Sequence, residues 1–329
     1  MTRSDNQPGQ PAAHGLVVVD KPAGMTSHDV VARMRRIAGT RKIGHAGTLD
    51  PMATGVLVLG VGKGTKLLGH LTLTEKAYAA TMRLGQHTST DDAEGELLGA
   101  TAAGHLTETE IRSAALGFTG EIQQVPPQVS AVKVDGKRAY ASARAGHEVK
   151  LEARSVTVTE FTVTDVRSPS VDAPHGAGAP QPAASPAEAD TGIGADTAQA
   201  CVDVDLLVRC SSGTYVRSLA RDLGVSLGVG GHLTALRRTR VGPYDLDQAR
   251  TLEELAEECT IVPLAAAVDA AFPRRDLSGE QARRIAHGNR IPSADMGSSP
   301  VGLFDPTGQV VALGEERQDH TKPIVVFVQ

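Results

Sequence analysis

The sequence predicts an α+β protein in which one large domain is followed by a small β-rich module. Apolar residues alternate with polar ones over 76–84, as in a strand, and recur with helical spacing over 27–38. From about residue 272 the pattern changes to Gly and Pro turns between brief apolar runs. At 329 residues and 40% apolar content, the chain is long enough to bury the core of such a protein.

Local signals place further elements along the chain. A short apolar strand is expected at 15–20, and Ser27 is placed to cap the helix that runs to Ala38. A capping box at 107–110 predicts a helix that ends near Phe118. The remaining predicted strands are 56–61, 129–134, 154–166, 199–210, 301–304, 310–313 and 324–328, and the remaining helices are 213–223, 252–258 and 279–286.

Two segments have the composition of disordered chain. Residues 1–13 form a polar leader, and 21 of the 32 residues in 167–198 are Ala, Pro, Gly or Ser. Such a segment cannot bury enough apolar surface to offset its ordering entropy. We therefore predict a disordered insertion at the tip of a hairpin. The hairpin belongs to a large domain of residues 14–268, which is followed by a module of residues 269–329.

The charge distribution leaves room for a nucleic-acid partner. The net charge of −5 argues weakly against one, but residues 14–90 hold ten Lys and Arg against four Asp and Glu, and residues 207–250 hold seven against three. The three cysteines match no metal-site spacing, and neither a signal peptide nor a membrane span is visible. These features predict a soluble cytoplasmic protein.

A glycine-rich stretch at 60–66 superficially resembles a nucleotide loop. A Walker A motif requires Gly and Ser or Thr at the places that here hold Leu57 and Gly64. The dinucleotide-binding glycine pattern is also incomplete, since its third glycine comes one residue early. The sequence therefore argues against ATP or NAD binding.

Asp50 is the strongest candidate for chemistry. It is the only formally charged side chain between Lys42 and Lys63, and it lies in a Gly-punctuated loop before an apolar strand. Asp50 followed by Pro51 could simply initiate a turn, which is the ordinary role of such a pair. Composition alone favours this turn-forming role. The motifs along the rest of the chain favour a chemical role for Asp50 instead.

The chain closely resembles the bacterial tRNA pseudouridine-55 synthases, the TruB family, over about residues 15–250. The motifs that carry the resemblance are Val19-Asp-Lys-Pro-Ala-Gly-Met-Thr-Ser, Gly44-His-Ala-Gly-Thr-Leu-Asp-Pro-Met-Ala-Thr-Gly-Val-Leu, Glu75-Lys-Ala-Tyr, Leu84-Gly-x-x-Thr-x-Thr-x-Asp-x-x-Gly, Gln124-Val-Pro-Pro, Ser212-Gly-Thr-Tyr-Val-Arg and Gly231-His-Leu-x-x-Leu-Arg-Arg. The resemblance implies a mixed, largely antiparallel sheet of the pseudouridine synthase type and a PUA-like, RNA-binding C-terminal module.

The implied reaction is isomerisation of uridine 55 in the T-loop of tRNA. The glycosidic bond breaks, the uracil turns, and it rejoins the sugar through carbon 5. The resemblance implies no cofactor, no metal, and a monomer that binds the T-arm stem-loop without a guide RNA or an obligatory protein partner. Alternatives are a tRNA-folding chaperone in which catalysis is secondary, and the guide-RNA-dependent branch of the same family.

The resemblance also assigns catalytic roles. Asp50 matches the catalytic aspartate, which acts through an ester adduct or a glycal intermediate. Arg217 matches the arginine that pairs with this aspartate, although without its context it would be taken for a helix-surface arginine. Tyr78 matches the tyrosine that stacks on the flipped uracil, and a packed strand tyrosine is an equal alternative.

Substrate-binding roles follow in the same way. His45, in a Gly-rich turn, matches a histidine that fills the space left by the extruded uridine. Leu236 matches a hydrophobic contact under the base, and Tyr215 is a pocket-wall or packing residue. Lys21, before Pro22, is mainly structural but could face RNA phosphate. Lys133 belongs to a mobile segment, 124–140, that resembles the one closing over the T-arm.

Overall fold

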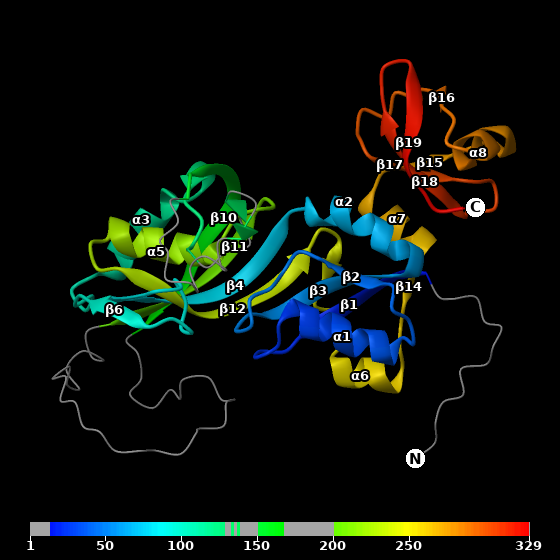
Figure 1. Cartoon of the computed structure of the whole chain (residues 1–329). Helices are drawn as coiled ribbons and strands as arrows, with labels where there is room; N and C mark the ends of the chain where they lie inside the picture. Colours follow the sequence, from blue (N-terminus) through cyan, green and yellow to red (C-terminus); the bar gives the residue numbers. More distant parts are fainter. Residues whose placement is uncertain (1–13, 129–132, 135–136, 139–150, 168–200, 329) are drawn as a thin grey trace, which may run out of the picture. The chain divides into compact units, whose positions relative to one another are not determined.

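The computed structural model describes most of the chain (Figure 1). The predicted leader at 1–13, and the predicted insertion at 167–198 apart from Arg167, lie outside the described residues. Residues 129–132, 135–136 and 139–140 of the predicted mobile segment lie outside them as well. The structure describes residues 14–128, 133–134, 137–138, 151–167 and 201–328.

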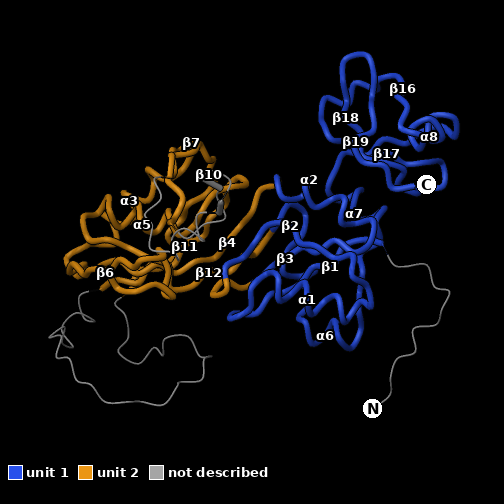
Figure 2. Tube along the Cα trace, viewed as in Figure 1, with its two compact units in different colours: residues 1–50, 55–73, 241–329 blue, residues 51–54, 74–240 orange. Residues whose placement is uncertain are grey.

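The chain divides into two units (Figure 2). The first contains residues 1–50, 55–73 and 241–329, and the second contains residues 51–54 and 74–240. The chain therefore passes between the units several times, once directly after Asp50. In the part of the chain that the structure describes, no helix is long and apolar enough to cross a membrane.

The N-terminal strands of the first unit form an antiparallel group. Strand β1 (Gly15–Lys21) pairs along its whole length with β3 (Thr54–Val61), and β14 (Val262–Pro263) pairs with β1. Strand β2 (Ile43–Ala46) pairs with the C-terminal half of β3. The other elements of this part are α1 (Ser27–Ile37), η1 (Gly62–Leu67), α2 (Leu68–Thr72), β13 (Tyr244–Asp245), α6 (Leu252–Glu257) and α7 (Leu264–Ala271).

Helix α1 begins at Ser27, the residue that the sequence predicted as its cap. Thr26, and not Ser27, is the N-cap: its hydroxyl accepts from the Asp29 N–H at 3.1 Å, and the Asp29 carboxylate accepts from the Thr26 N–H at 2.9 Å. This reciprocal pair is a capping box. The prediction for Ser27 was wrong because its hydroxyl bonds elsewhere, to the backbone of Leu49.

The C-terminal module of the first unit has the predicted β-rich character. Five strands are hydrogen-bonded in the order β15-β17-β18-β19-β16. Ile285, Leu303 and Val311 are among the buried residues of its own core, while Phe304 and Phe327 join the core that includes α7 and β1. The bounds are β15 (Arg274–Asp276), α8 (Gly279–Ala286), β16 (Ile291–Pro292), β17 (Val301–Phe304), β18 (Val310–Glu316) and β19 (His320–Val326).

The second unit is built on five strands in the order β12-β4-β11-β10-β7. The pairs β4–β11, β11–β10 and β10–β7 are antiparallel, and the predicted hairpin is confirmed as β10–β11. Helices α3 and α5 lie on one face of these strands (Figure 1). The bounds are β4 (Lys76–Leu84), β5 (Gln86–Thr88), β6 (Leu97–Ala100), α3 (Glu108–Leu116), β7 (Gly120–Gln124), β8 (Lys133–Val134), β9 (Lys137–Arg138), β10 (Arg154–Arg167), β11 (Val202–Cys210), α5 (Val216–Ser226) and β12 (Gly231–Val241).

The glycines at 60–64 serve close backbone packing. A Cβ on Gly60 would lie 2.7 Å from the Gly64 carbonyl oxygen, and a Cβ on Gly64 would lie 1.9 Å from the Gly15 carbonyl oxygen. Neither contact leaves room for a side chain. This packing of η1 against β1 accounts for the glycine-rich stretch that resembled a nucleotide loop.

We predict that Gly64→Ala destabilises the protein by about 1–3 kcal/mol, because the new methyl group must displace the backbone of Gly15. Gly69→Ala is the matched control. Gly69 lies in α2, and a Cβ at this position would meet nothing within 4 Å, so its replacement should be neutral or stabilising by about 0.5–1 kcal/mol. Urea unfolding of both variants measures the difference, and equal midpoints would contradict the packing argument.

Candidate active site

The loop that carries Asp50 is anchored to helix α1 by Ser27. The Ser27 hydroxyl accepts from the Leu49 N–H at 2.9 Å and donates to the Leu49 carbonyl at 3.1 Å. Ser27 is fully buried, so these bonds replace water for both backbone groups of the residue before Asp50. Asp50 itself is partly exposed.

His45 lies in strand β2 and not in the predicted turn. Its backbone is opposite Leu59 of β3, and its ring meets that of His28 edge-on, with centroids 5.3 Å apart. Pairing with β3 fixes the direction of the side chain, because successive side chains of a strand point to opposite faces. A strand was missed here because Gly44 and Gly47 on either side are typical of turns.

Lys21 is fully buried at the end of β1. Its ammonium donates to the Pro22 carbonyl at 2.8 Å. This position favours the structural interpretation of the Lys21-Pro22 pair over contact with RNA phosphate.

Tyr78 lies on the buried face of β4 in the second unit. Lys76, Tyr78, Ala80 and Met82 share that face, which confirms the predicted alternation. Burial, followed by repulsion from Arg238, lowers the pKa of Lys76 to about 8. Opposite Lys76 on β11, burial raises the pKa of the Cys210 thiol to about 11, so this cysteine is neutral at physiological pH.

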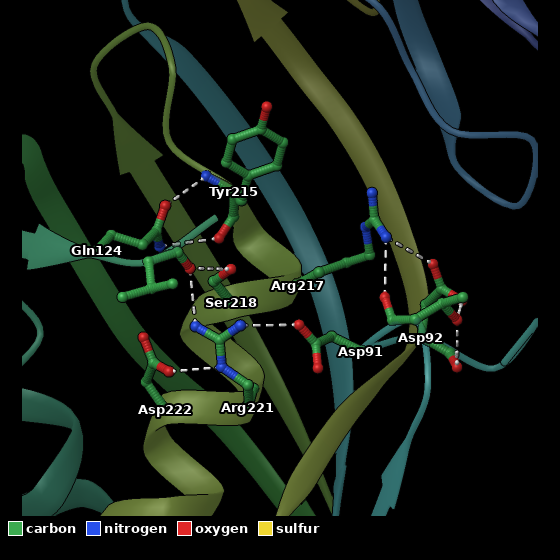
Figure 3. Close-up of polar contacts among 10 residues, drawn as sticks. Asp91, Asp92, Gln124, Tyr215, Arg217, Ser218, Arg221 and Asp222 are labelled. Atoms are coloured by element: carbon green, nitrogen blue, oxygen red, sulfur yellow. Dashed lines mark hydrogen bonds and ion pairs between the residues drawn. The ribbon is translucent and has the colours of Figure 1, made fainter. Parts of the chain in front are cut away.

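Arg217 is a buried arginine in the first turn of α5, so the helix-surface interpretation is wrong. Its Nη1 donates to the Thr90 carbonyl at 2.8 Å and lies 3.4 Å from Oδ2 of Asp92 (Figure 3). The side chains of Arg217 and Asp92 are only 5% and 4% exposed. A charge pair buried this deeply is costly to break, because the remaining partner would be an uncompensated buried charge.

Asp92 is a site residue that the sequence reasoning did not single out. Its Oδ1 accepts from the Thr90 hydroxyl at 2.5 Å and from the Glu94 N–H at 3.1 Å, while its carbonyl accepts from the Thr88 hydroxyl at 2.7 Å. A Cβ on Gly95 would lie 2.3 Å from Oγ1 of Thr90. These are the fixed positions of the Thr-x-Thr-x-Asp-x-x-Gly motif, so the motif itself was the available signal.

Tyr215 is held through its backbone by Gln124. The Gln124 amide donates to the Tyr215 carbonyl at 3.0 Å, and its oxygen accepts from the Tyr215 N–H at 2.8 Å (Figure 3). Leu236 of β12 is buried, and Lys133 lies in β8, although its side chain is outside the described residues. Asp50 belongs to the first unit, and Tyr78 and Arg217 belong to the second, so their convergence stays a prediction.

The residues described by the structure hold no group of three or more His, Cys, Asp or Glu side chains placed to bind a metal ion. The cysteines at 201 and 210 are both buried free thiols.

Family models match most of the chain. The N-terminal domain of TruB family pseudouridylate synthases matches residues 35–175, a tRNA pseudouridylate synthase B C-terminal domain matches 217–266, and a tRNA pseudouridine synthase II C-terminal domain matches 272–328.

Named relatives match nearly the full length. A tRNA pseudouridine synthase B of Thermobifida fusca (strain YX) is 62% identical over 316 residues, which are 96% of this chain and 99% of the relative. A tRNA pseudouridine synthase B of Arthrobacter sp. (strain FB24) is 53% identical over 321 residues, which are 95% of this chain and 96% of the relative. Among solved structures, one titled "Crystal Structure of a Cbf5-Nop10-Gar1 Complex" has a TM-score of 0.66 at 27% identity, covering 96% of this chain and 84% of that one.

We predict that Ser27→Ala destabilises the protein by about 1–3 kcal/mol, because the buried backbone groups of Leu49 lose their partner. Ser155→Ala is the control. It removes an exposed hydroxyl bonded to Glu121 and should change the free energy of unfolding by less than about 0.5 kcal/mol. Thermal unfolding of the two variants compares them, and equal losses would argue against the anchoring role of Ser27.

Proposed function

The chain belongs to the TruB family and catalyses pseudouridine formation in tRNA, and we propose that its target is uridine 55 of the T-loop, with Asp50 as the catalytic carboxylate. A carboxylate with an ordinary pKa near 3.9 is ionised at neutral pH. It can attack the anomeric carbon to form an ester, or stabilise positive charge there while a sugar proton leaves to give a glycal. The lone charge of Asp50 in its motif, on a loop anchored by Ser27, supports this role.

We propose that Arg217 pairs with Asp50 during catalysis. The observation that supports it is the position of the guanidinium: Thr90 and Asp92 both contact Nη1 of Arg217 and hold that edge of the group. A guanidinium oriented in advance keeps a carboxylate ionised and fixes its direction. Electrostatic groups arranged before the reaction contribute most to catalysis, since they need no reorganisation during it.

Tyr78 and Leu236 are proposed to receive the extruded uridine, and His45 is proposed to fill the space that it leaves. Tyr78 offers an aromatic face for stacking, Leu236 an apolar contact, and His45 the side chain that occupies the vacated space. Unstacking a base costs a few kcal/mol, which contacts of this kind offset. The segment 124–140, including Lys133, and the PUA-like C-terminal module are proposed as further RNA contacts.

We further propose that the chain acts in the cytoplasm as a monomer, without a guide RNA or an obligatory protein partner. Two solved structures of similar fold carry titles of complexes, a "Cbf5-Nop10-Gar1 Complex" and an "H/ACA RNP bound to a substrate RNA". The named relatives in sequence, which cover nearly the whole chain, are tRNA pseudouridine synthases B. Product formation by the purified chain on a T-arm stem-loop distinguishes the stand-alone enzyme from a guide-dependent one.

Asp50→Asn should lower the single-turnover rate about a thousandfold or more, because the amide cannot act as a nucleophile or stabilise positive charge. The dissociation constant for tRNA should change less than about threefold, since the two side chains have the same shape. Mapping pseudouridine in tRNA measures the rate, and Asp247→Asn, an exposed acid of the same unit, is the control. Normal product formation by Asp50→Asn would overturn the assignment and favour the chaperone alternative.

Arg217→Ala should lower turnover by about a hundredfold or more with a modest loss of tRNA affinity. Because this change also leaves Asp92 as an unpaired buried charge, Arg217→Lys serves as the companion variant that retains the charge. We expect the lysine variant to remain slow, since it cannot reproduce the guanidinium geometry. Equal losses of turnover and affinity would instead place Arg217 on the RNA-binding surface.

A further inference from the structure

Arg221 connects three separate parts of the second unit. It lies one helical turn after Arg217 on α5. Its Nη1 lies 3.0 Å from Oδ2 of Asp91, its Nη2 donates to the Val125 carbonyl at 2.8 Å, and its Nε donates to Asp222 at 2.8 Å (Figure 3). Each of the three guanidinium nitrogens thus has a partner, and the bonds to Asp91 and Val125 join α5 to two other segments.

Asp91 and Asp92 face two arginines of the same helix. Asp92 lies against Arg217, and the neighbouring Asp91 lies against Arg221. Burial raises the pKa of Asp91, and the charges of Arg221 and Arg217 oppose that rise. The backbone of Asp91 has a φ of +59°, in the left-handed region that few non-glycine residues adopt. The pair with Arg221 therefore holds a turn that would otherwise be unfavourable, directly beside the residue that orients Arg217.

Val125 ties the end of β7 to the same helix. Its carbonyl accepts from Arg221 and also from the Ser218 hydroxyl at 3.0 Å. The preceding residue, Gln124, makes the two bonds to the Tyr215 backbone. The start of the segment proposed to contact RNA and the helix that carries Arg217 are thus joined by four hydrogen bonds.

We propose that Arg221 is a positioning residue for Arg217: by holding the Asp91–Asp92 turn and the Val125 carbonyl against α5, it sets the direction of the Arg217 guanidinium. The inference rests on the proposed function, in which Arg217 acts on the catalytic carboxylate. Arg221 itself need not touch the substrate. Its removal should therefore slow the reaction without weakening RNA binding to the same degree.

The test compares Arg221→Met with Arg221→Lys and Asp91→Asn in the full chain, with a T-arm stem-loop as substrate. We expect Arg221→Met to lower the single-turnover rate about 10- to 100-fold, because small misplacements of catalytic groups have effects of that size. The dissociation constant for the stem-loop should change less than about threefold. Arg221→Lys, which keeps the charge and can retain one of the contacts, should recover part of the rate.

A double variant separates positioning from general destabilisation. Arg221→Met combined with Asp91→Asn should be no slower than Arg221→Met alone, because both changes break the same pair. Asp222→Asn is the matched control: it removes another partner of Arg221 but touches neither the 88–95 loop nor Val125, so the rate should stay at the wild-type value.

Three outcomes would overturn the inference. The first is a wild-type single-turnover rate for Arg221→Met. The second is a lower melting temperature of this variant with an unchanged rate at a temperature where it is folded. The third is an equal loss of rate and of affinity for the stem-loop. Failure of the proposed function is distinguishable from these, since the unaltered chain would then leave uridine 55 unmodified.

Discussion

The buried contact of Arg217 with Thr90 and Asp92 constrains how the loop at 88–95 meets helix α5 in the second unit. A guanidinium and a carboxylate that are both about 95% buried lose their hydration, and each ion costs several kcal/mol unless the other is correctly placed. The loop at 88–95 must therefore fold with its carboxylate facing α5. The Thr90 hydroxyl and the Glu94 N–H both donate to Asp92 in this arrangement, so its buried carboxylate has partners within its own loop as well as on α5.

In the first unit, Asp50 is also held in place, but through the backbone before it and not through its side chain. Here the carboxylate stays partly exposed, and the backbone before it is fixed by the buried Ser27 hydroxyl. Ser27 is in turn held at the start of a helix whose capping box is supplied by Thr26 and Asp29. A reactive group placed on a rigid backbone loses little entropy when the substrate arrives. Of the two proposed catalytic groups, Asp50 is thus supported by a fixed backbone, and Arg217 is fixed at its side chain.

Much of this architecture could be predicted from local sequence patterns. The alternation over β4 and the capping box at 107–110 are local signals, and the structure confirms both. Strand β2 and the 11-residue strand β12 were missed, because glycines and arginines mask their periodicity. The role of Asp92 depends on α5, which lies more than a hundred residues away in the sequence. No local pattern can reveal a partner of that kind, although the regular spacing of its motif marked the segment as special.

The arginine–aspartate contacts also explain how an acidic chain can serve a polyanionic substrate. Asp91 and Asp92 lie beside the residues proposed to handle RNA, where free carboxylates would repel phosphate. Each is instead largely buried and faces an arginine, so neither presents an uncompensated charge to the substrate. The net charge of −5 is thus a poor guide to the charge that each part of the chain presents, since residues 14–90 alone hold ten cationic side chains against four acidic ones. Because both aspartates are paired with arginines, they can support the proposed catalytic role of Arg217 without adding an unpaired negative charge beside the RNA.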